Sequence, residues 1–337
     1  MQIFKAGRHM KKIAFVTGGF SGEAIVSYES AKTIYANLDR QKYEVYKVDI
    51  TPQGWWYVPD EGERIAINKS DFTFVRRAEK IRFDGVFIGI HGTPGEDGKL
   101  QGYFDMLGLP YQTCDATTSA LTFNKRYTVA VAALSGIKVA QSLHLFAGDT
   151  YDTSAIVADL GLPLFVKPNN GGSSIGMSKV TAAEQLADAI TKAFAEDNQV
   201  LIEQFIKGRE FTIGVFRSKG QIITLPMTEI IPKTAFFDFE AKYTPGLTDE
   251  ITPADAPDDQ AQKVAETARR VYQVFNCRGA VRIDFIYNTD DDAPYMLEIN
   301  TVPGQTQNSL VPQQVRASGR TLLYFYTMLI EEMFPRS

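Results

Sequence analysis

The sequence predicts an α/β and α+β fold of several domains, with a parallel α/β unit at the N-terminus. Three observations lead to this prediction. The chain has 337 residues, which is enough for two or three domains. Up to Gly92, apolar strand-like runs alternate with helical periodicity, the rhythm of an open parallel sheet. From Leu121 onward this rhythm changes, and strands and helices follow in an order typical of α+β units.

The first elements come from the alternation of apolar runs with helical periodicity. Strands are expected at residues 12–19, 43–50 and 83–92, and a helix at 26–38. Glycine-rich loops, GGFSGE (18–23) and HGTPGEDG (91–98), stand at the ends of the first and third strands. Because ligands of such sheets bind at the carboxyl ends of strands, both loops are candidate binding loops. Residues 1–9 are expected to lie outside the fold, as vector-derived or upstream sequence.

The later elements are expected in a less regular order. The helices are predicted at 125–134, 182–195 and 259–276, and the strands at 162–167, 177–180, 199–205, 210–216, 221–230, 279–288 and 293–300. A polar stretch rich in Pro, Asp and Thr, residues 244–260, is expected to be a mobile loop.

Composition narrows the class of protein. The chain is 44% hydrophobic and 22% charged, with a net charge of −5, which argues against nucleic acid as a partner. We find neither a signal peptide nor an apolar run of roughly 18 residues, so no membrane association is expected. Cys114 and Cys277 stand far apart and in no metal-ligand spacing. They are expected to be reduced, buried apolar residues of a cytosolic protein.

The segment VKPNNGGSSIG, residues 166–176, has two interpretations. Asn and Gly tolerate positive φ, so the segment could be a tight turn. A strand that ends in Lys167 and opens into glycines could also be a phosphate-binding loop, because bare backbone amides can approach an anion closely. The segment alone does not decide between the two.

The last two predicted strands place four polar side chains on one face. Arg282 and Asp284 are two residues apart, as are Glu298 and Asn300, so each pair shares a face of its strand. The set could be a solvated face with a salt bridge. The apolar flanks favour a deep position instead, where two carboxylates need a cation between them. Carboxylate and amide oxygens suit Mg²⁺, and Arg282 would then face a substrate.

The common nucleotide-binding fingerprints are missing from the candidate loops. GGFSG is not the GxGxxG of dinucleotide-binding proteins, which argues against an NAD(P) oxidoreductase, and no P-loop is found. Phosphate binding would therefore have to depend on Lys125, Lys167 and the loop 171–176.

Nine segments in order resemble the D-alanine–D-alanine ligases of the ATP-grasp superfamily. They are GGFSGEAIVS (18–27), HGTPGEDGKLQG (91–102), LGLPY (107–111), NK (124–125), VKPNNGGSSIGMSKV (166–180), IEQFIKGREFT (202–212), EAKY (240–243), RIDF (282–285) and LEINTVPGQTQNSLVP (297–312). The resemblance implies a three-domain ATP-grasp fold, with an N-terminal domain at 10–124, a central domain at 125–214 and a C-terminal catalytic domain at 215–337.

The resemblance also implies roles for single residues, grouped here by what they would bind. For the first D-alanine these are Glu23, which would hold the ammonium, and His91; for ATP they are Lys125, Lys167, Ser173, Ser174, Glu203, the backbone of Phe205 and Ile206, and Glu210. Asp284, Glu298 and Asn300 would bind Mg²⁺, as two ions for which Mn²⁺ can substitute. Arg282 and the Gly304 amide would stabilise an oxyanion. The second D-alanine would contact Ser309, the Leu310 amide and Lys242, and Ser173 would bond Tyr243 and Glu23 and help to close the site.

By this resemblance the expected activity is ATP-dependent ligation of two D-alanine molecules through D-alanyl phosphate. A homodimer in the bacterial cytoplasm, supplying peptidoglycan precursors, is implied as well. A ligase for D-lactate or D-serine and a non-catalytic ATP-binding regulatory module are the alternatives. Ile25, Phe237 and Gln305 depart from the family pattern. Gln305 stands nearest the expected second-substrate pocket and leaves the second substrate open.

Overall fold

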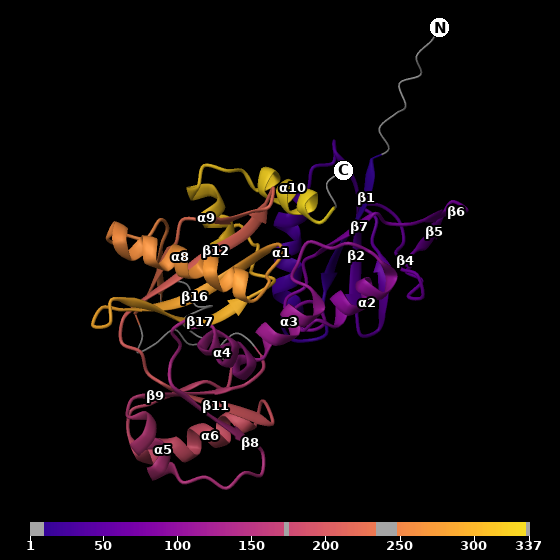
Figure 1. The fold of residues 1–337 in the computed structure, drawn as a ribbon. Coiled ribbons are helices and arrows are strands. Elements are labelled where there is room, and N and C mark those ends of the chain that lie inside the picture. The colour runs from indigo at the N-terminus through magenta and orange to yellow at the C-terminus, as the bar shows by residue number, and fades with distance from the viewer. Residues whose placement is uncertain (1–9, 172–174, 234–247, 335–337) are drawn as a thin grey trace.

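Three main sheets organise the chain in the computed structural model, which describes residues 10–171, 175–233 and 248–334. Figure 1 shows the N-terminal sheet on one side, the C-terminal sheet beside it, and the central sheet below. The predicted combination of α/β and α+β architecture is confirmed.

The N-terminal sheet has the strand order β4-β3-β2-β1-β7. Its strands are β1 (Lys11–Gly18), β2 (Tyr43–Thr51), β3 (Gly54–Tyr57), β4 (Ile65–Ala66) and β7 (Gly85–Ile88), and its helices are α1 (Ala24–Asn37), α2 (Lys99–Leu107) and α3 (Ala116–Phe123). β1 runs parallel to both β2 and β7, as predicted. Two strands that were not predicted, β3 and β4, add an antiparallel edge to these parallel strands. The tight turn at Pro52 and Gln53 can join only antiparallel strands.

A small hairpin and a four-stranded central sheet follow. The hairpin joins β5 (Phe74–Arg76) to β6 (Glu79–Ile81), and the central sheet has the order β10-β9-β11-β8. Its elements are α4 (Lys125–Leu134), β8 (Ser142–Phe146), α5 (Thr153–Leu160), β9 (Leu164–Pro168), β10 (Ser178–Val180), the 3₁₀ turn η1 (Ala183–Gln185), α6 (Leu186–Phe194) and β11 (Gln199–Gln204). Apolar residues of α5 and α6 and of the strands form one core on one face of this sheet.

The C-terminal sheet has the order β15-β14-β12-β16-β17, with β13 paired to β12. Its elements are β12 (Arg209–Ser218), β13 (Gln221–Thr224), β14 (Thr228–Pro232), β15 (Thr248–Ile251), α8 (Asp258–Val274), β16 (Ala280–Asn288), β17 (Ala293–Asn300), α9 (Leu310–Ala317) and α10 (Leu322–Glu332). The strand predicted at 221–230 is two strands, since Pro226 between them has no N–H for a ladder. The predicted loop 244–260 contains β15 and the start of α8.

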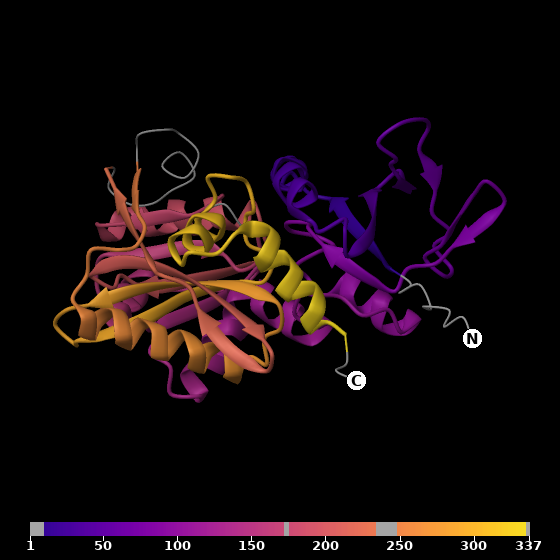
Figure 2. The ribbon, with the colours of Figure 1, turned by 90° about the horizontal axis from the view of Figure 1, so that it is seen from above.

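The hydrophobic cores join the N-terminal and C-terminal parts. Phe15, Ile34 and Phe87 of the N-terminal unit belong to the same buried cluster as Phe325 and Tyr326 of α10. In Figure 2, α10 (yellow) extends towards the N-terminal elements. Burial of this shared apolar surface stabilises the contact between the first and last parts of the chain. The predicted domain boundaries stay a prediction, and the one between residues 214 and 215 falls within β12.

Two further sequence expectations concern single features. Cys114 and Cys277 are free thiols and both are buried, as predicted. In the three described ranges, no helix has the length and apolar character needed to cross a membrane.

Candidate active site

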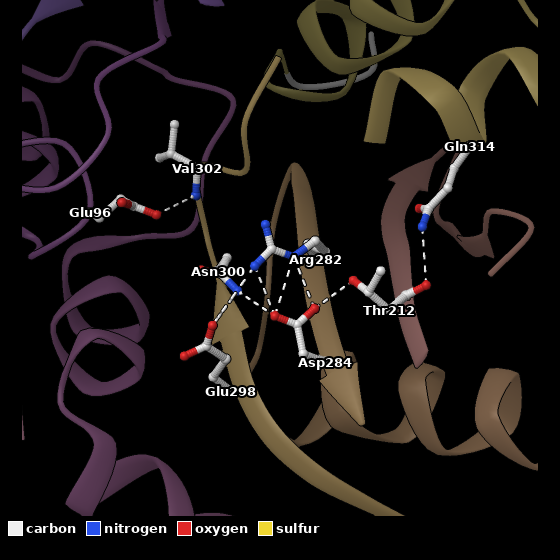
Figure 3. Close-up of polar contacts among 8 residues, drawn as sticks. All are labelled: Glu96, Thr212, Arg282, Asp284, Glu298, Asn300, Val302 and Gln314. Carbon is white, nitrogen blue, oxygen red and sulfur yellow. Dashed lines mark hydrogen bonds and ion pairs between the residues drawn. The ribbon is translucent and has the colours of Figure 1, made fainter. Parts of the chain in front are cut away.

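Three neighbouring strands bring a row of polar side chains together. Asp284 on β16 lies directly opposite Thr212 on β12 and Glu298 on β17. Arg282 lies opposite Asn300 in the next row. Figure 3 shows Arg282, Asp284, Glu298 and Asn300 turned towards one another from the two strands. The sequence prediction that these four residues share a face is therefore confirmed.

Arg282 and Asp284 form the centre of this cluster. Nε and Nη2 of Arg282 donate to Asp284 Oδ1 and Oδ2 at 2.9 and 2.8 Å, and Nη2 lies 3.8 Å from Glu298 Oε1. Burial works against the charge of Arg282, but the adjacent Asp284 carboxylate outweighs it and raises the pKa of the guanidinium. A cation does lie between the two carboxylates, and it is Arg282 itself. The expectation that Arg282 faces a substrate stays a prediction.

The donor set of the cluster fits a magnesium ion. Two carboxylates and the side chain of Asn300 supply the hard oxygen ligands that Mg²⁺ prefers. The amide nitrogen of Asn300 lies 3.2 Å from Asp284 Oδ2 and 3.5 Å from Glu298 Oε1, so the three side chains lie close together. Over the described part of the chain, no group of three or more His, Cys, Asp and Glu side chains could hold a metal. A metal site in this cluster would therefore use Asn300 beside the two carboxylates.

The Asp284 carboxylate also accepts a hydrogen bond from Thr212 of β12, which in turn bonds Gln314 of α9. Thr212 Oγ1 donates to Asp284 Oδ1 at 2.5 Å, and the Thr212 carbonyl accepts from Gln314 Nε2 of α9 at 3.1 Å. Gln314 is fully buried and Thr212 is 2% exposed. Figure 3 shows this line of contacts running from α9 to the cluster. Sequence reasoning missed both residues, because their partners come from other elements.

Glu23 lies in the loop after β1, at the N-cap position of α1. Its carboxylate packs against Gly92, where an added Cβ would lie 2.2 Å from Glu23 Oε2. Burial raises the pKa of Glu23, Lys125 acts in the opposite direction, and Glu298 adds to the rise. These influences place Glu23 within electrostatic reach of both the central domain and the Arg282 cluster, as its predicted role requires.

His91 is buried and uses both ring nitrogens inside the protein. Nδ1 lies 2.7 Å from the Val302 carbonyl, and Nε2 lies 2.9 Å from Ser30 Oγ. Burial lowers the pKa of His91 to about 4, so the ring is neutral at pH 7. Since a carbonyl can only accept, Nδ1 carries the proton and Nε2 accepts from Ser30. His91 therefore supports the loop at Val302, and its predicted contact with substrate stays a prediction.

Glu96 is a site residue that sequence reasoning did not assign. Its Oε2 accepts from the Gly92 amide at 2.7 Å, and its Oε1 accepts from the Val302 amide at 3.1 Å. Burial, followed by the nearby Glu23 charge, raises the pKa of Glu96 to about 8. The available signal was its position within HGTPGEDG, one of the two candidate binding loops, but its partner Val302 is 206 positions away.

The loop after β17 brings Gly304, Ser309 and Leu310 together. An added Cβ at Gly304 would lie 3.0 Å from Ser309 Oγ, so the two residues are adjacent. Ser309 occupies the N-cap position of α9 without a side-chain capping bond, and its hydroxyl lies 2.8 Å from Thr306 Oγ1. Leu310 begins α9, where backbone amides point out of the helix end.

Gln305 of the same loop is turned into the protein. Its Oε1 accepts from Tyr326 OH at 3.0 Å, and its Nε2 donates to the Pro303 carbonyl at 3.1 Å. Gln305 is 7% exposed. The expectation that this side chain bears on the second-substrate pocket is therefore not supported by its direction.

Lys125 and the base of the loop at 169–171 lie together on the central domain. Lys125 Nζ donates to the Gly171 carbonyl at 2.6 Å. The buried Asn169 ties this loop to the start of α4, since its carbonyl accepts from the Lys125 amide and its Oδ1 from the Arg126 amide. The structure thus places the predicted phosphate lysine beside the predicted phosphate loop.

Lys167 and Glu203 form an ion pair on adjacent strands of the central sheet. Lys167 Nζ lies 2.5 Å from Glu203 Oε2, and both side chains are largely buried. The Phe205 amide donates to the Pro163 carbonyl at 3.1 Å, so this N–H is already engaged, and Ile206 beside it is half-buried. Glu210 is half-buried on β12. The predicted adenine and ribose residues thus follow one another along β11 and into β12.

Four predicted site residues lie outside the described ranges. They are Ser173, Ser174, Lys242 and Tyr243, and Phe237 is a fifth position of interest there. Their predicted roles stay predictions.

Comparison with known proteins identifies the family. Residues 12–114 match a family model described as the D-ala D-ala ligase N-terminus, and residues 132–334 match one described as the D-ala D-ala ligase C-terminus. A D-alanine–D-alanine ligase of Flavobacterium johnsoniae is 47% identical over 96% of this chain and 99% of its own length. A D-alanine–D-alanine ligase of Parabacteroides distasonis is 44% identical over 96% of this chain and 97% of its own length.

Solved structures agree with the sequence relatives. The VanG D-Ala:D-Ser ligase of Enterococcus faecalis has a TM-score of 0.86 and 30% identity, and the match covers 96% of this chain and all of that chain. The D-alanine–D-alanine ligase of Bacillus anthracis in complex with ATP has a TM-score of 0.76 and 29% identity, over 96% and 97% of the two chains. The three sheets and the polar cluster on β16 and β17 are those of an ATP-grasp protein. Within that class, the chain belongs to the D-alanine–D-alanine ligase family.

Proposed function

We propose that the protein joins two D-alanine molecules into D-alanyl-D-alanine and converts ATP to ADP and phosphate. The observation that carries this proposal is the cluster of Arg282, Asp284, Glu298 and Asn300 on β16 and β17, within electrostatic reach of Glu23. The cluster combines hard oxygen ligands with a fixed cation, which is the equipment that phosphoryl transfer to a carboxylate requires.

The reaction would proceed in two steps. The carboxylate of the first D-alanine would attack the γ-phosphorus of ATP, giving D-alanyl phosphate and ADP. The amine of the second D-alanine would then attack the acyl carbon, and phosphate would leave. Positioning and charge stabilisation account for catalysis, so no nucleophilic Ser or Cys is needed.

The residues of this chain would divide that work between the two substrates. Glu23 would hold the ammonium of the first D-alanine, and Lys125 and Lys167 would hold phosphates. Arg282 and the Gly304 amide would stabilise the oxyanion of the second step, and Ser309 with the Leu310 amide would hold the second carboxylate. The adjacency of Gly304 and Ser309 supports this division, because the proposed oxyanion donor and the proposed second subsite would then be neighbours.

A divalent cation belongs to the proposal. Asp284, Glu298 and Asn300 would hold Mg²⁺, as two ions, or Mn²⁺ in its place. The ion supplies positive charge to the phosphate oxygens when it is bound. Asp284 accepts from Arg282, whose positive charge balances the carboxylate. A bound metal ion would balance the charge of the carboxylates in place of the guanidinium.

The wider setting rests on the family alone. We place the reaction in the bacterial cytoplasm, in the supply of peptidoglycan precursors, and we expect a homodimer. D-alanine is the preferred second substrate in this proposal, since the two sequence relatives above are named D-alanine–D-alanine ligases. D-serine is the first alternative, because the VanG enzyme named for it has the same fold.

The test is phosphate release with ATP, Mg²⁺ and D-alanine, combined with mass analysis of the product. Dipeptide formed well above the rate of an Asp284→Ala variant would support the proposal. D-serine and D-lactate are tested as competing second substrates in the same assay. Phosphate release without dipeptide would point to another second substrate, and bound ATP without any release would favour a regulatory module.

A further inference from the structure

The backbone N–H and carbonyl of Val302 both bond to one loop of the N-terminal unit. Its N–H donates to Glu96 Oε1 at 3.1 Å, and its carbonyl accepts from His91 Nδ1 at 2.7 Å. The other oxygen of Glu96 accepts from the Gly92 amide at 2.7 Å. Figure 3 shows Glu96 reaching Val302 from the neighbouring loop, just beyond the strand that carries Asn300. One carboxyl group thus connects two loops that are distant in sequence.

The two connected loops carry different parts of the candidate site. Gly92 packs against the Glu23 carboxylate, which is the predicted partner of the first ammonium group. Val302 lies two residues after Asn300 and two residues before Gly304, the predicted oxyanion donor. The charges that face Glu96 are those of Glu23 and Arg282. A movement of one loop relative to the other would therefore change the distance between Glu23 and the position of the carboxyl group of the first D-alanine.

We propose that Glu96 is a positioning residue that sets the geometry of the subsite for the first D-alanine. Its carboxyl group joins loop 91–96 to loop 301–304, so that the ammonium and carboxyl ends of one amino acid can be held at the same time. This inference rests on the proposed function, and it assigns no contact between Glu96 and substrate.

Only a carboxyl group of this length satisfies both amides. A carboxyl group has two oxygens that can accept, whereas the amide of Gln accepts at one and would turn its NH₂ towards an N–H. Asp is one methylene shorter and would not reach both partners. Burial raises the pKa of Glu96 to about 8, and the hydrogen bonds from the Gly92 and Val302 amides offset part of that rise.

The experiment compares Glu96→Gln with Asp97→Asn. Asp97 is the adjacent acid, and within the described ranges its hydrogen bonds come from the amide and Nζ of Lys99, so Asp97→Asn makes the same change of an acid to an amide without touching Val302. The D-alanine dependence of ADP formation is fitted with separate constants for the first and second D-alanine, and the Kd of ATP is measured by direct titration. Thermal unfolding of each variant reports whether it folds.

We expect Glu96→Gln to raise the constant for the first D-alanine by about 10- to 100-fold, the loss given when one buried N–H is left without an acceptor. The Kd of ATP should stay within about twofold, and Asp97→Asn should match the wild type. An unchanged first constant in a folded Glu96→Gln variant would overturn the proposal, as would an equal rise for ATP. A wild-type protein that forms no dipeptide would instead refute the proposed function.

A measurement on the wild type covers the case in which Glu96→Gln does not fold. The Val302 amide donates to Glu96, so it should be protected from hydrogen exchange in a peptide spanning residues 300–305. In the same peptide, Pro303 has no N–H, and the Gln305 amide bonds Ser30 at 3.1 Å. Fast exchange at Val302, on the scale of an unstructured loop, would mean that Glu96 does not hold this peptide and would overturn the proposal.

Discussion

The two sides of the candidate site treat buried carboxyl groups differently. On the C-terminal side, Asp284 receives two bonds from Arg282, whose charge also faces Glu298. On the N-terminal side, Glu96 accepts from two neutral backbone amides, and burial raises the pKa of both Glu23 and Glu96. The comparison shows that the carboxylates of the C-terminal side already have a cation, Arg282. The carboxyl groups of the N-terminal side would instead be stabilised in their ionised form by a cation that arrives with the substrate, such as an ammonium group.

The largest expected effect comes from removing the cation of the C-terminal side. Arg282→Ala would leave Asp284 and Glu298 without their shared partner and would remove the predicted oxyanion donor. We expect product formation to fall by about 10³-fold and the free energy of unfolding by about 3 kcal/mol. The rate of dipeptide synthesis and a urea titration measure the two changes.

Arg209→Ala is the matched control for that variant. Arg209 forms a similar two-bond pair with Glu229, 2.7 Å for each bond, outside the cluster. Its loss should lower stability while activity falls far less. If both variants lose activity equally, the effect of Arg282 is one of stability and not of catalysis.

The second effect tests the N-terminal side through pH. The pKa of Glu96 is raised in the folded state to about 8, while an unfolded Glu titrates near 4.3. The folded state therefore keeps a proton that the unfolded state loses. The stability linked to Glu96 is complete below about pH 4 and is lost as pH rises towards 8, by at most about 1.4 kcal/mol per pH unit. Glu96→Gln should remove this slope.

Urea titrations at pH 5, 6, 7 and 8 measure that difference. Comparing the wild type with Glu96→Gln cancels the contribution of His91, whose pKa is lowered and which titrates in both proteins. A stability difference that does not vary between pH 5 and 8 would show that Glu96 is ionised in the folded state.

A smaller effect is expected from the support behind Asp284. Thr212→Val keeps the size of the side chain and removes the hydroxyl that donates to Asp284 Oδ1. We expect the Mg²⁺ concentration for half-maximal activity to rise about tenfold, since groups that orient metal ligands usually contribute 10- to 100-fold in affinity. Thr212→Ser should restore the wild-type value.

Thr122→Val is the control for this change. Its buried hydroxyl bonds only to backbone carbonyls of α3, outside the cluster. An Mg²⁺ dependence that shifts equally in Thr122→Val and Thr212→Val would mean that the hydroxyl of Thr212 does not act through Asp284. The thermal unfolding temperature as a function of Mg²⁺ gives an independent measure of binding.

The strands around the cluster could be predicted from the sequence, and the contacts behind it could not. Apolar alternation predicted β17 at residues 293–300. It also predicted that Arg282 and Asp284 share one face of β16, because the two-residue period of a strand is a local property of the sequence. Thr212 and Glu96 depend on the register of β12 with β16 and on the approach of the loop at Val302. Both are features of the tertiary structure, and no local sequence pattern predicts them. The short strands between residues 54 and 81 were missed because two to four residues show no clear period.

Gln305 shows the limit of reasoning from chain neighbours, and it gives the smallest predicted effect. Its place after Pro303 and Gly304 suggested the second-substrate pocket, yet its side chain bonds Tyr326 of α10. Gln305→Met should therefore leave the ratio of D-alanyl-D-alanine to D-alanyl-D-serine unchanged. It should cost about 1 kcal/mol of stability, because the hydrogen bond to the buried Tyr326 is lost. Tyr326→Phe removes the same bond from the other side, and the double variant should cost little more than either single one. A changed product ratio in Gln305→Met but not in Tyr326→Phe would show that Gln305 acts on the substrate and not through α10.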